Sequence, residues 1–217
     1  MAKTKSEKPV NSLVNLYLIV YNVASCVGWS AVLASVALHY YNGNTFTTIY
    51  PNIALILNVV QTAATLEIFH SLVGFVKADP FPTIVQVFSR LGLCWGILDL
   101  FNDPLVRESE YVTSMVVAWS LTEIVRYSHF AATLSLGKSP YITLWLRYTC
   151  FYVLYPLGAG SEFLLIRAAL DTNPSSNMSI LLQVLSGFYP PGFYFMYTHM
   201  MKQRVKYLAT NKKKKQE

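Results

Sequence analysis

Charged residues are scarce in this sequence: only 13% of its 217 residues are Asp, Glu, Lys or Arg, against about 25% in an ordinary soluble domain. The chain also has only 3 cysteines, too few and too scattered for a disulfide scaffold. The low charge argues against nucleic-acid binding, because such proteins carry many basic residues. Hydrophobic residues make up 53% of the chain, which excludes a disordered protein and indicates a small protein that crosses a membrane several times.

Six apolar stretches are each near or above the ~20 residues that a helix needs to cross the hydrocarbon core. They predict an all-α membrane protein with six transmembrane helices in one domain, residues 13–201, of which the third helix is the shortest and most polar. A polar segment, 1–12, precedes this domain, and a basic segment, 202–217, follows it. The predicted spans are 13–40, 53–76, 83–101, 113–136, 141–170 and 180–201.

Basic residues predict the orientation, because loops rich in Lys and Arg stay on the cytosolic side. With six spans and a cytosolic N-terminus, 12 of the 17 basic residues fall in cytosolic segments, whereas the opposite side holds Arg107 alone. Both termini are therefore expected in the cytosol. The C-terminal Lys214-Lys215-Gln216-Glu217 resembles the dilysine signal that returns membrane proteins to the endoplasmic reticulum. The alternative is a basic tail attracted to anionic lipids.

Eight charged residues fall within the predicted spans, and their charges sum to zero. Six of them lie deep, where an unpaired charge costs about 2.5–3.5 kcal/mol at a helix centre, so we expect these six to face inward and either to pair or to line a wet cavity. The other two, Asp99 and Arg167, lie near the lumenal face, where they are expected to pair or to reach the interface. The six deep residues are Glu67, Arg90, Glu123, Arg126, Arg147 and Glu162.

Four of the deep groups lie on four different spans, roughly 9–15 Å from the cytosolic ends of their helices. They are therefore expected to share one layer. This layer is either a set of buried salt bridges that fixes the helices or a vestibule, open to the cytosol, for an anionic substrate. The four groups belong to Glu67, Arg90, Arg126 and Arg147.

The fifth predicted span carries a stripe of functional groups. Pro156 removes one helix hydrogen bond and is expected to kink the helix there, while Gly158 leaves room for a ligand or for another helix. Tyr155 and Glu162 are roughly 10 Å apart along the axis, so a substrate's reacting carbons can lie between their tips. A carboxyl group in apolar surroundings can donate a proton, and a tyrosine near an arginine can accept one. The residues within about 80° of arc are Arg147, Phe151, Tyr155, Gly158 and Glu162.

These residues belong to a pattern that resembles the very-long-chain (3R)-3-hydroxyacyl-CoA dehydratases, also described as protein tyrosine phosphatase-like or PASTICCINO-type membrane dehydratases. The strongest match is the segment from Tyr155 to Glu162, YPLGAGSE, and the order of the motifs extends the resemblance over nearly the whole chain. The family's catalytic tyrosine and glutamate fall on Tyr155 and Glu162. The other motifs are Tyr21-Asn22, Leu66-Glu67-Ile68, Gln86-Val87-Phe88-Ser89-Arg90, the stretch from Trp119 to Tyr127, and Leu146-Arg147-Tyr148.

The resemblance implies an endoplasmic reticulum enzyme that dehydrates long and very-long-chain (3R)-3-hydroxyacyl-CoA to trans-2-enoyl-CoA, the third step of fatty acid elongation. Tyr155 is assigned as the base at the α-carbon and Glu162 as the acid for the leaving hydroxyl, although the two roles can be exchanged. Acyl-CoA and membrane lipid are the expected ligands, with no metal, redox cofactor or nucleic acid. The expected partners are an elongase, a 3-ketoacyl-CoA reductase and a trans-2-enoyl-CoA reductase. The residues expected to bind substrate or organise the site are Glu67, Gln86, Arg90, Arg126, Arg147 and Gly158.

Three other functions compete with this interpretation. A phosphatase is disfavoured, because Cys150 and Pro156 have the spacing of the Cys-x5-Arg loop but proline replaces the arginine that binds phosphate. A transporter would use the buried charges as a relay, but it usually shows repeats or several broken helices, and the sequence has one candidate. A catalytically inactive scaffold of the elongation machinery would keep the fold and tolerate Tyr155→Phe and Glu162→Gln.

Overall fold

The computed structural model describes residues 12–77 and 80–213, with side chains as far as residue 208. Most of the predicted N-terminal tail and the dilysine segment lie outside these described residues. The described chain consists of helices and short connections. The helices are α1 (Ser12–Tyr41), η1 (Phe46–Thr48), α2 (Ile49–Ala63), α3 (Thr65–Leu72), α4 (Pro80–Leu91), the π-helix η2 (Gly92–Asp99), α5 (Pro104–Arg107), α6 (Glu110–Leu136), α7 (Tyr141–Arg147), α8 (Phe151–Asp171) and α9 (Ser176–Lys213).

Apart from the short α5, these helices form six runs that correspond to the six predicted stretches: α1, η1–α2–α3, α4–η2, α6, α7–α8 and α9. The all-α prediction is therefore confirmed. Within the described residues, α6 and α9 lack the length of apolar sequence found in the other runs, because α6 contains charged residues and α9 contains prolines and a basic end. Four runs are long and apolar enough to cross a membrane by length and composition: Ser12–Tyr41, Phe46–Leu72, Pro80–Asp99 and Tyr141–Asp171.

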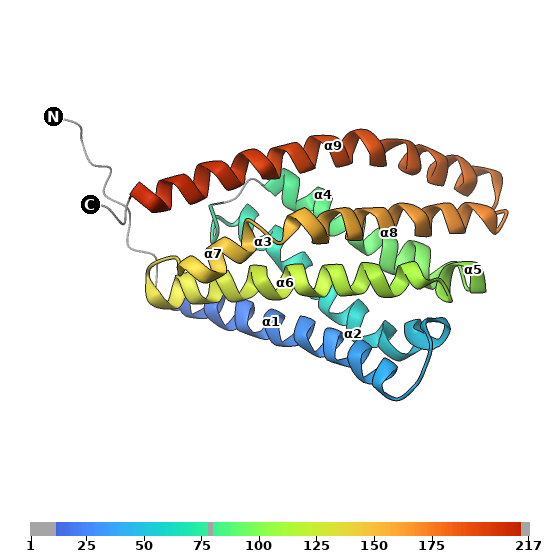
Figure 1. Ribbon diagram of the computed structural model, residues 1–217, viewed down its shortest axis with the longest axis horizontal. Helices are drawn as coiled ribbons and strands as arrows, with labels where there is room; N and C mark the ends of the chain where they lie inside the picture. Colours follow the sequence, from blue (N-terminus) through green and yellow to red (C-terminus); the bar gives the residue numbers. More distant parts are fainter. Residues whose placement is uncertain (1–11, 78–79, 214–217) are drawn as a thin grey trace.

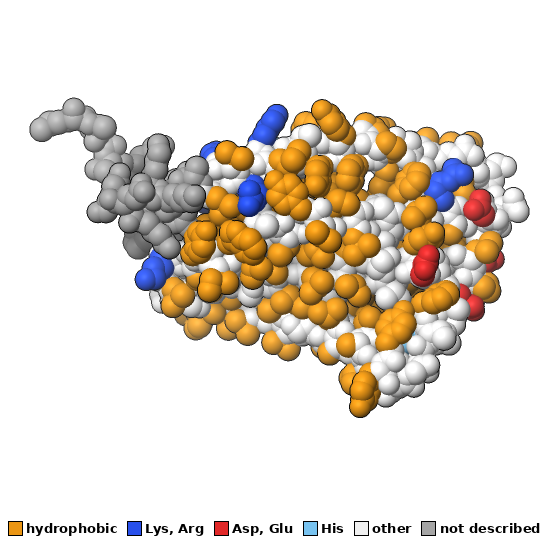
Figure 2. Space-filling model, viewed as in Figure 1, with side chains coloured by type: hydrophobic (Ala, Val, Ile, Leu, Met, Phe, Trp, Pro, Cys, Tyr) orange, Lys and Arg blue, Asp and Glu red, His pale blue; other side chains and the backbone are white. Residues whose placement is uncertain are grey.

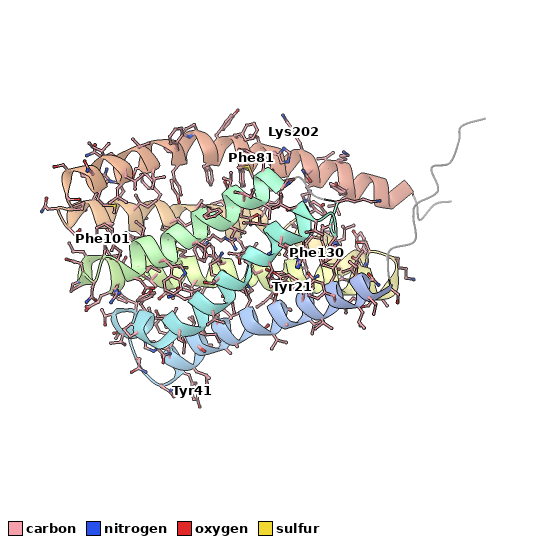
Figure 3. The ribbon with its side chains drawn as sticks, turned by 180° about the vertical axis from the view of Figure 1, so that it is seen from behind. Tyr21, Tyr41, Phe81, Phe101, Phe130 and Lys202 are labelled. Atoms are coloured by element: carbon pink, nitrogen blue, oxygen red, sulfur yellow. The ribbon has the colours of Figure 1, made fainter. Side chains whose placement is uncertain are left out.

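Four long helices lie side by side in the order α1, α6, α8, α9 (Figure 1), and each contacts the next. The α2–α3 and α4–η2 runs cross the other side of this layer, as the view from behind shows (Figure 3). The start of α1 and the end of α9 lie at the same end of the bundle, which we call the terminal end. This arrangement supports an even number of passes through the membrane.

The bundle has a buried apolar core between α1, α2, η2, α6 and α8. Trp29, Ile53, Leu98 and Met115 are almost fully buried within it. Gly28 brings α1 and α2 together, because a Cβ atom there would lie 2.8 Å from Cγ1 of Val60. Such small-residue contacts are common between membrane helices, where close packing replaces the hydrophobic effect as the driving force.

The outer surface is also apolar, as a membrane protein requires. Many large side chains on the outside of the helices are exposed, among them Leu55 at 81% and Tyr194 at 73%. Orange side chains cover most of the face in Figure 2, where the acidic residues gather at the end opposite the terminal end. Lipid tails can solvate such a surface, whereas water cannot without a large free-energy cost.

Two boundaries differ from the sequence predictions. The fifth span is interrupted at Tyr148–Cys150, between α7 and α8, and Pro156 lies inside the continuous helix α8. The interruption therefore lies about two helix turns before Pro156, where Tyr148, Thr149 and Cys150 form a turn. The last helix continues to Lys213 instead of ending at residue 201, so most of the predicted basic tail is helical.

Candidate active site

Glu162 lies on α8 with both carboxylate oxygens in hydrogen bonds. The indole Nε1 of Trp119, on α6, donates to Oε1 at 2.7 Å. The hydroxyl of Tyr189, on α9, donates to Oε2 at 3.0 Å. Three helices thus fix the orientation of one carboxyl group, which is what a catalytic group needs, because small misplacements lower rates strongly.

Gly158 allows α8 to approach α6 closely, one turn before Glu162. This glycine is buried, and a Cβ atom added to it would lie 3.5 Å from Cβ of Ala118 and 3.9 Å from Cδ1 of Trp119. Of the two uses that the sequence allowed, the structure shows contact with another helix. Gly158 therefore packs against the turn of α6 whose indole reaches Glu162.

Tyr155 lies about two turns before Glu162 on the same helix and is half-buried. Its ring stacks on Phe193 of α9, with ring centroids 5.3 Å apart and planes at 19°, and Tyr197 lies next to it at 6.4 Å. Within the described residues, the Tyr155 hydroxyl makes no hydrogen bond, and no arginine stacks on its ring. The hydroxyl group is therefore available to a substrate.

A network of ion pairs lies beside this site, and we call it the Glu67 network: Glu67 on α3, Arg90 on α4, and Glu123 and Arg126 on α6. Nη1 of Arg90 lies 2.5 Å from Oε1 of Glu123. Arg126 donates to Glu123 through Nε at 2.6 Å and to the two oxygens of Glu67 at 2.7 and 2.8 Å. The Tyr127 hydroxyl also donates to Glu67.

These bonds distinguish between the two interpretations of the charged layer, a set of buried salt bridges or a vestibule for an anionic substrate. Both guanidinium groups are bound to carboxylates, and Glu123 is only 1% exposed. The cavity beside the network, to which Gln86 contributes, has a volume of about 10 Å³, which is the size of one water molecule. A phosphate group does not fit there, so the Glu67 network is a buried salt-bridge layer and not an anion vestibule.

The Glu67 network reaches Glu162 through Trp119. The guanidinium carbon of Arg90 lies 5.0 Å from the centroid of the Trp119 ring, a cation–π contact of about 0.5–2 kcal/mol. The same indole donates to Glu162. Of the residues expected to organise the site, Glu67, Arg90 and Arg126 therefore come together at its edge.

Arg147 does not join the network, because it ends α7 and the Tyr148–Cys150 turn separates it from α8. Its guanidinium carbon lies 4.4 Å from the ring centroid of Phe130 and 5.8 Å from that of Tyr148. Its Nη1 is buried without a hydrogen-bond partner. Of the six deep charges, four thus pair as expected, whereas within the described residues Arg147 and Glu162 form no ion pair and the partners of Glu162 are neutral.

The two charges expected near the lumenal face do not pair with each other. Asp99 accepts hydrogen bonds from Tyr50 at 2.5 Å and from Asn58 at 2.8 Å, and its nearest cation is Arg107, at 3.7 Å. Arg167 is exposed, as expected for a residue that reaches the interface.

Trp119 and Tyr189 are the residues of this site that sequence reasoning missed. Trp119 precedes Glu123 by one helix turn, and Tyr189 stands directly before Pro190-Pro191. Both are polar aromatics within apolar segments, where a buried N–H or O–H group usually finds a partner. That signal predicts that a partner exists, but not which residue of another helix it is.

For metals, no group of three His, Cys, Asp or Glu side chains assembles within the described residues.

The chain is similar to a family of known proteins. The family model described as "Protein tyrosine phosphatase-like protein, PTPLA" matches residues 61–210. A Schizosaccharomyces pombe protein named "Probable very-long-chain (3R)-3-hydroxyacyl-CoA dehydratase" is 43% identical over 88% of this chain and 91% of its own length. The Arabidopsis thaliana dehydratase named PASTICCINO 2 is 39% identical over 91% and 95% of the two chains. The Homo sapiens "Very-long-chain (3R)-3-hydroxyacyl-CoA dehydratase 2" is 34% identical over 91% and 82%. No solved structure matches the chain.

The fold and the site together define a helical membrane protein with a carboxyl group and a phenol on one buried helix face. The chain belongs to the protein tyrosine phosphatase-like (PTPLA) family, whose curated members similar to it carry the name of a dehydratase.

Proposed function

We propose that this protein is a very-long-chain (3R)-3-hydroxyacyl-CoA dehydratase, which forms trans-2-enoyl-CoA in the third step of fatty acid elongation. The observation that carries the proposal is the arrangement on α8: Glu162 is held by donors from two other helices, and the Tyr155 hydroxyl on the same helix is left available. Relatives named for this reaction are 34–43% identical over most of the chain.

The reaction requires two proton transfers, and Tyr155 and Glu162 supply the groups for both. The thioester acidifies the α-proton, which the Tyr155 phenolate takes as the base, and protonated Glu162 gives its proton to the β-hydroxyl, which leaves as water. Tyr155 then holds the proton that Glu162 has lost, and one proton transfer between the two groups, directly or through water, restores the site. When Glu162 carries this proton on Oε2, the Tyr189 hydroxyl accepts a hydrogen bond from it instead of donating one. The exchanged assignment, with Glu162 as base and Tyr155 as acid, uses the same two groups.

The remaining predicted residues support the site from a distance. Arg90 and the rest of the Glu67 network hold the Trp119 ring, and Gly158 sets the spacing of α6 and α8. This role explains why charged groups are kept in the membrane although a buried ion pair adds little net stability. Gln86 lines the water-sized cavity beside the network and belongs to the same support.

The proposal also includes a membrane location, a topology and partner enzymes. We place the protein in the endoplasmic reticulum membrane with six spans and both termini in the cytosol, supported by the distribution of basic residues and the dilysine sequence. An elongase, a 3-ketoacyl-CoA reductase and a trans-2-enoyl-CoA reductase are its expected partners, because they make its substrate and consume its product. The acyl chain would run between helices into membrane lipid.

Conversion of 3-hydroxyacyl-CoA by the purified protein tests the function. We expect activity in the wild type and a loss of more than about a hundredfold in Tyr155→Phe and Glu162→Gln, the usual scale for a general acid or base. Tyr194→Phe is the matched control, since Tyr194 is 73% exposed. Full activity in both site variants would refute the mechanism, and an inactive wild type would favour the scaffold.

A further inference from the structure

The α8–α9 interface leads from the proposed catalytic pair to the terminal end of the bundle. The two helices lie side by side and antiparallel (Figure 1). Tyr189 contacts Glu162, and Phe193 stacks on Tyr155. Further along α9, Tyr197 contacts Tyr152 with ring centroids 6.2 Å apart. The contacts then reach Arg204 and Tyr207, which face the turn between α7 and α8.

Two arginines at this turn are not neutralised. Nε of Arg204 donates to Oγ1 of Thr149 at 3.5 Å, and its guanidinium carbon lies 5.6 Å from the centroid of the Tyr152 ring. Arg147, on the other side of the turn, has its buried Nη1 without a partner. Within the described residues, neither arginine forms an ion pair, whereas Arg90 and Arg126 are both bound to carboxylates. Lys202 projects from α9 at the same end (Figure 3).

A pair of tyrosine rings lies beside Arg147 at the same turn. Tyr148 and Tyr207 are stacked, with ring centroids 4.8 Å apart and planes at 14°. Arg147 lies over Tyr148, Nζ of Lys206 lies 5.8 Å from the centroid of the Tyr207 ring, and Tyr207 is 42% exposed. An exposed ring of this kind can stack with a nucleobase, as aromatic side chains do in nucleic-acid binding proteins.

The separation between this turn and the catalytic pair fits coenzyme A. Arg204 comes eleven residues after Phe193, the ring stacked on Tyr155, which corresponds to about 16 Å along a helix. Roughly 15 bonds separate the pyrophosphate of an acyl-CoA from its α-carbon, and an extended chain advances ~1.2 Å per bond. The arm is therefore long enough to place the α-carbon at Tyr155 while the pyrophosphate stays at Arg204.

We propose that Arg204 and Arg147, together with the Tyr148–Tyr207 ring pair, form the binding site for the phosphate-bearing head of the substrate. The inference rests on the proposed function for the identity of the ligand. Arginine suits the role because its planar donors match phosphate oxygens. The phosphate bound is that of coenzyme A, and the alternative source of the same chemistry is an anionic lipid headgroup.

The test measures binding separately from turnover. The ligands are free coenzyme A and pantetheine, which lacks the nucleotide phosphates, and the protein is in phosphatidylcholine nanodiscs. We expect Arg204→Gln to raise the Kd of coenzyme A about tenfold, the scale of one lost charge-assisted hydrogen bond, and to leave pantetheine binding unchanged. Arg204→Lys should recover part of the affinity. Arg167→Gln, an exposed arginine at the other end of α8, should change neither.

Turnover then separates a failure of the site from a failure of the function. With 3-hydroxyacyl-CoA, Arg204→Gln should raise KM about tenfold with kcat nearly unchanged, and with the pantetheine thioester it should change neither. Equal loss with both substrates, or an effect on binding that appears only when phosphatidylserine is added, would overturn the inference. If coenzyme A binding depends on Arg204 but the wild type converts no substrate, the site stands and the dehydratase proposal fails.

Discussion

Glu162 is the residue at which α6, α8 and α9 meet, and neutral groups provide its hydrogen bonds. A neutral donor fixes the position of the carboxyl group without favouring its ionised form as strongly as an arginine would. That distinction matters for a group that must both hold and release a proton. It also gives a reason why Arg90 contacts the Trp119 ring and forms no ion pair with Glu162 itself, since a direct ion pair would fix Glu162 as a carboxylate.

Substitution of Tyr189 tests this arrangement with the loss of one oxygen atom. We expect Tyr189→Phe to lower kcat about tenfold, because one neutral hydrogen bond contributes about 1 kcal/mol to the position of Glu162, while KM changes little. The measurement is steady-state dehydration of 3-hydroxyacyl-CoA, with Tyr194→Phe on the same helix as the control. An unchanged kcat would show that Trp119 alone positions the carboxyl group.

Positions along one helix of the candidate site could be predicted from the sequence, whereas contacts between its helices could not. Tyr155 and Glu162 could be proposed as a pair because both lie on one helix, where the angle and the rise between two positions are fixed. Glu67, Arg90 and Arg126 could be placed in one layer because depth follows from distance to the helix end. Trp119 and Tyr189 could not be assigned, because the hydrogen bonds that they donate to Glu162 depend on how α6 and α9 rotate against α8.

At the scale of the element, interruptions of helices decide what each residue can reach. The Tyr148–Cys150 turn removes Arg147 from the α8 stripe and points it toward Phe130 and Tyr148. The proline predicted an irregularity in this span but not its position, since Pro156 lies inside the continuous helix α8. The helix ends were least predictable for α9, whose polar end continues as helix to Lys213.

Close contacts between helices can be tested at Gly28, where a Cβ atom would lie 2.8 Å from Cγ1 of Val60. We expect Gly28→Ala to destabilise the protein by about 1–3 kcal/mol, the usual cost of overpacking, because Val60 is stiff and cannot turn away. The measurement is the midpoint of thermal unfolding in detergent.

A double-mutant cycle gives the control for this prediction. In a Val60→Ala background the added methyl group of Gly28→Ala has space, so its cost should disappear, and the two substitutions should be coupled by about 1 kcal/mol or more. Equal destabilisation in both backgrounds would mean that α1 and α2 are not packed through this contact.

At the scale of the whole molecule, the number of crossings determines on which side each loop lies. Four helical runs are clearly apolar enough to span a membrane, whereas six crossings follow from the charge distribution and from the six helical runs. A four-span and a six-span protein both leave the C-terminus on the side of the N-terminus, so a tag at the C-terminus does not distinguish them. The loop between α6 and α7 and the loop between α8 and α9 do distinguish them, because the two arrangements place these loops on opposite sides.

Single cysteines in three loops therefore test the topology, in a background where Cys26, Cys94 and Cys150 are replaced by serine. With six spans, a membrane-impermeant maleimide added from the cytosolic side should label Lys138→Cys, and it should label Asn44→Cys and Ser175→Cys only after permeabilisation. If α6 and α9 do not cross, Lys138→Cys becomes protected and Ser175→Cys becomes accessible, while Asn44→Cys remains protected in both cases and serves as the control. Only the six-span pattern keeps α8 and α9 together in the bilayer, with the turn at Arg147 and Arg204 open to the cytosol where coenzyme A is found.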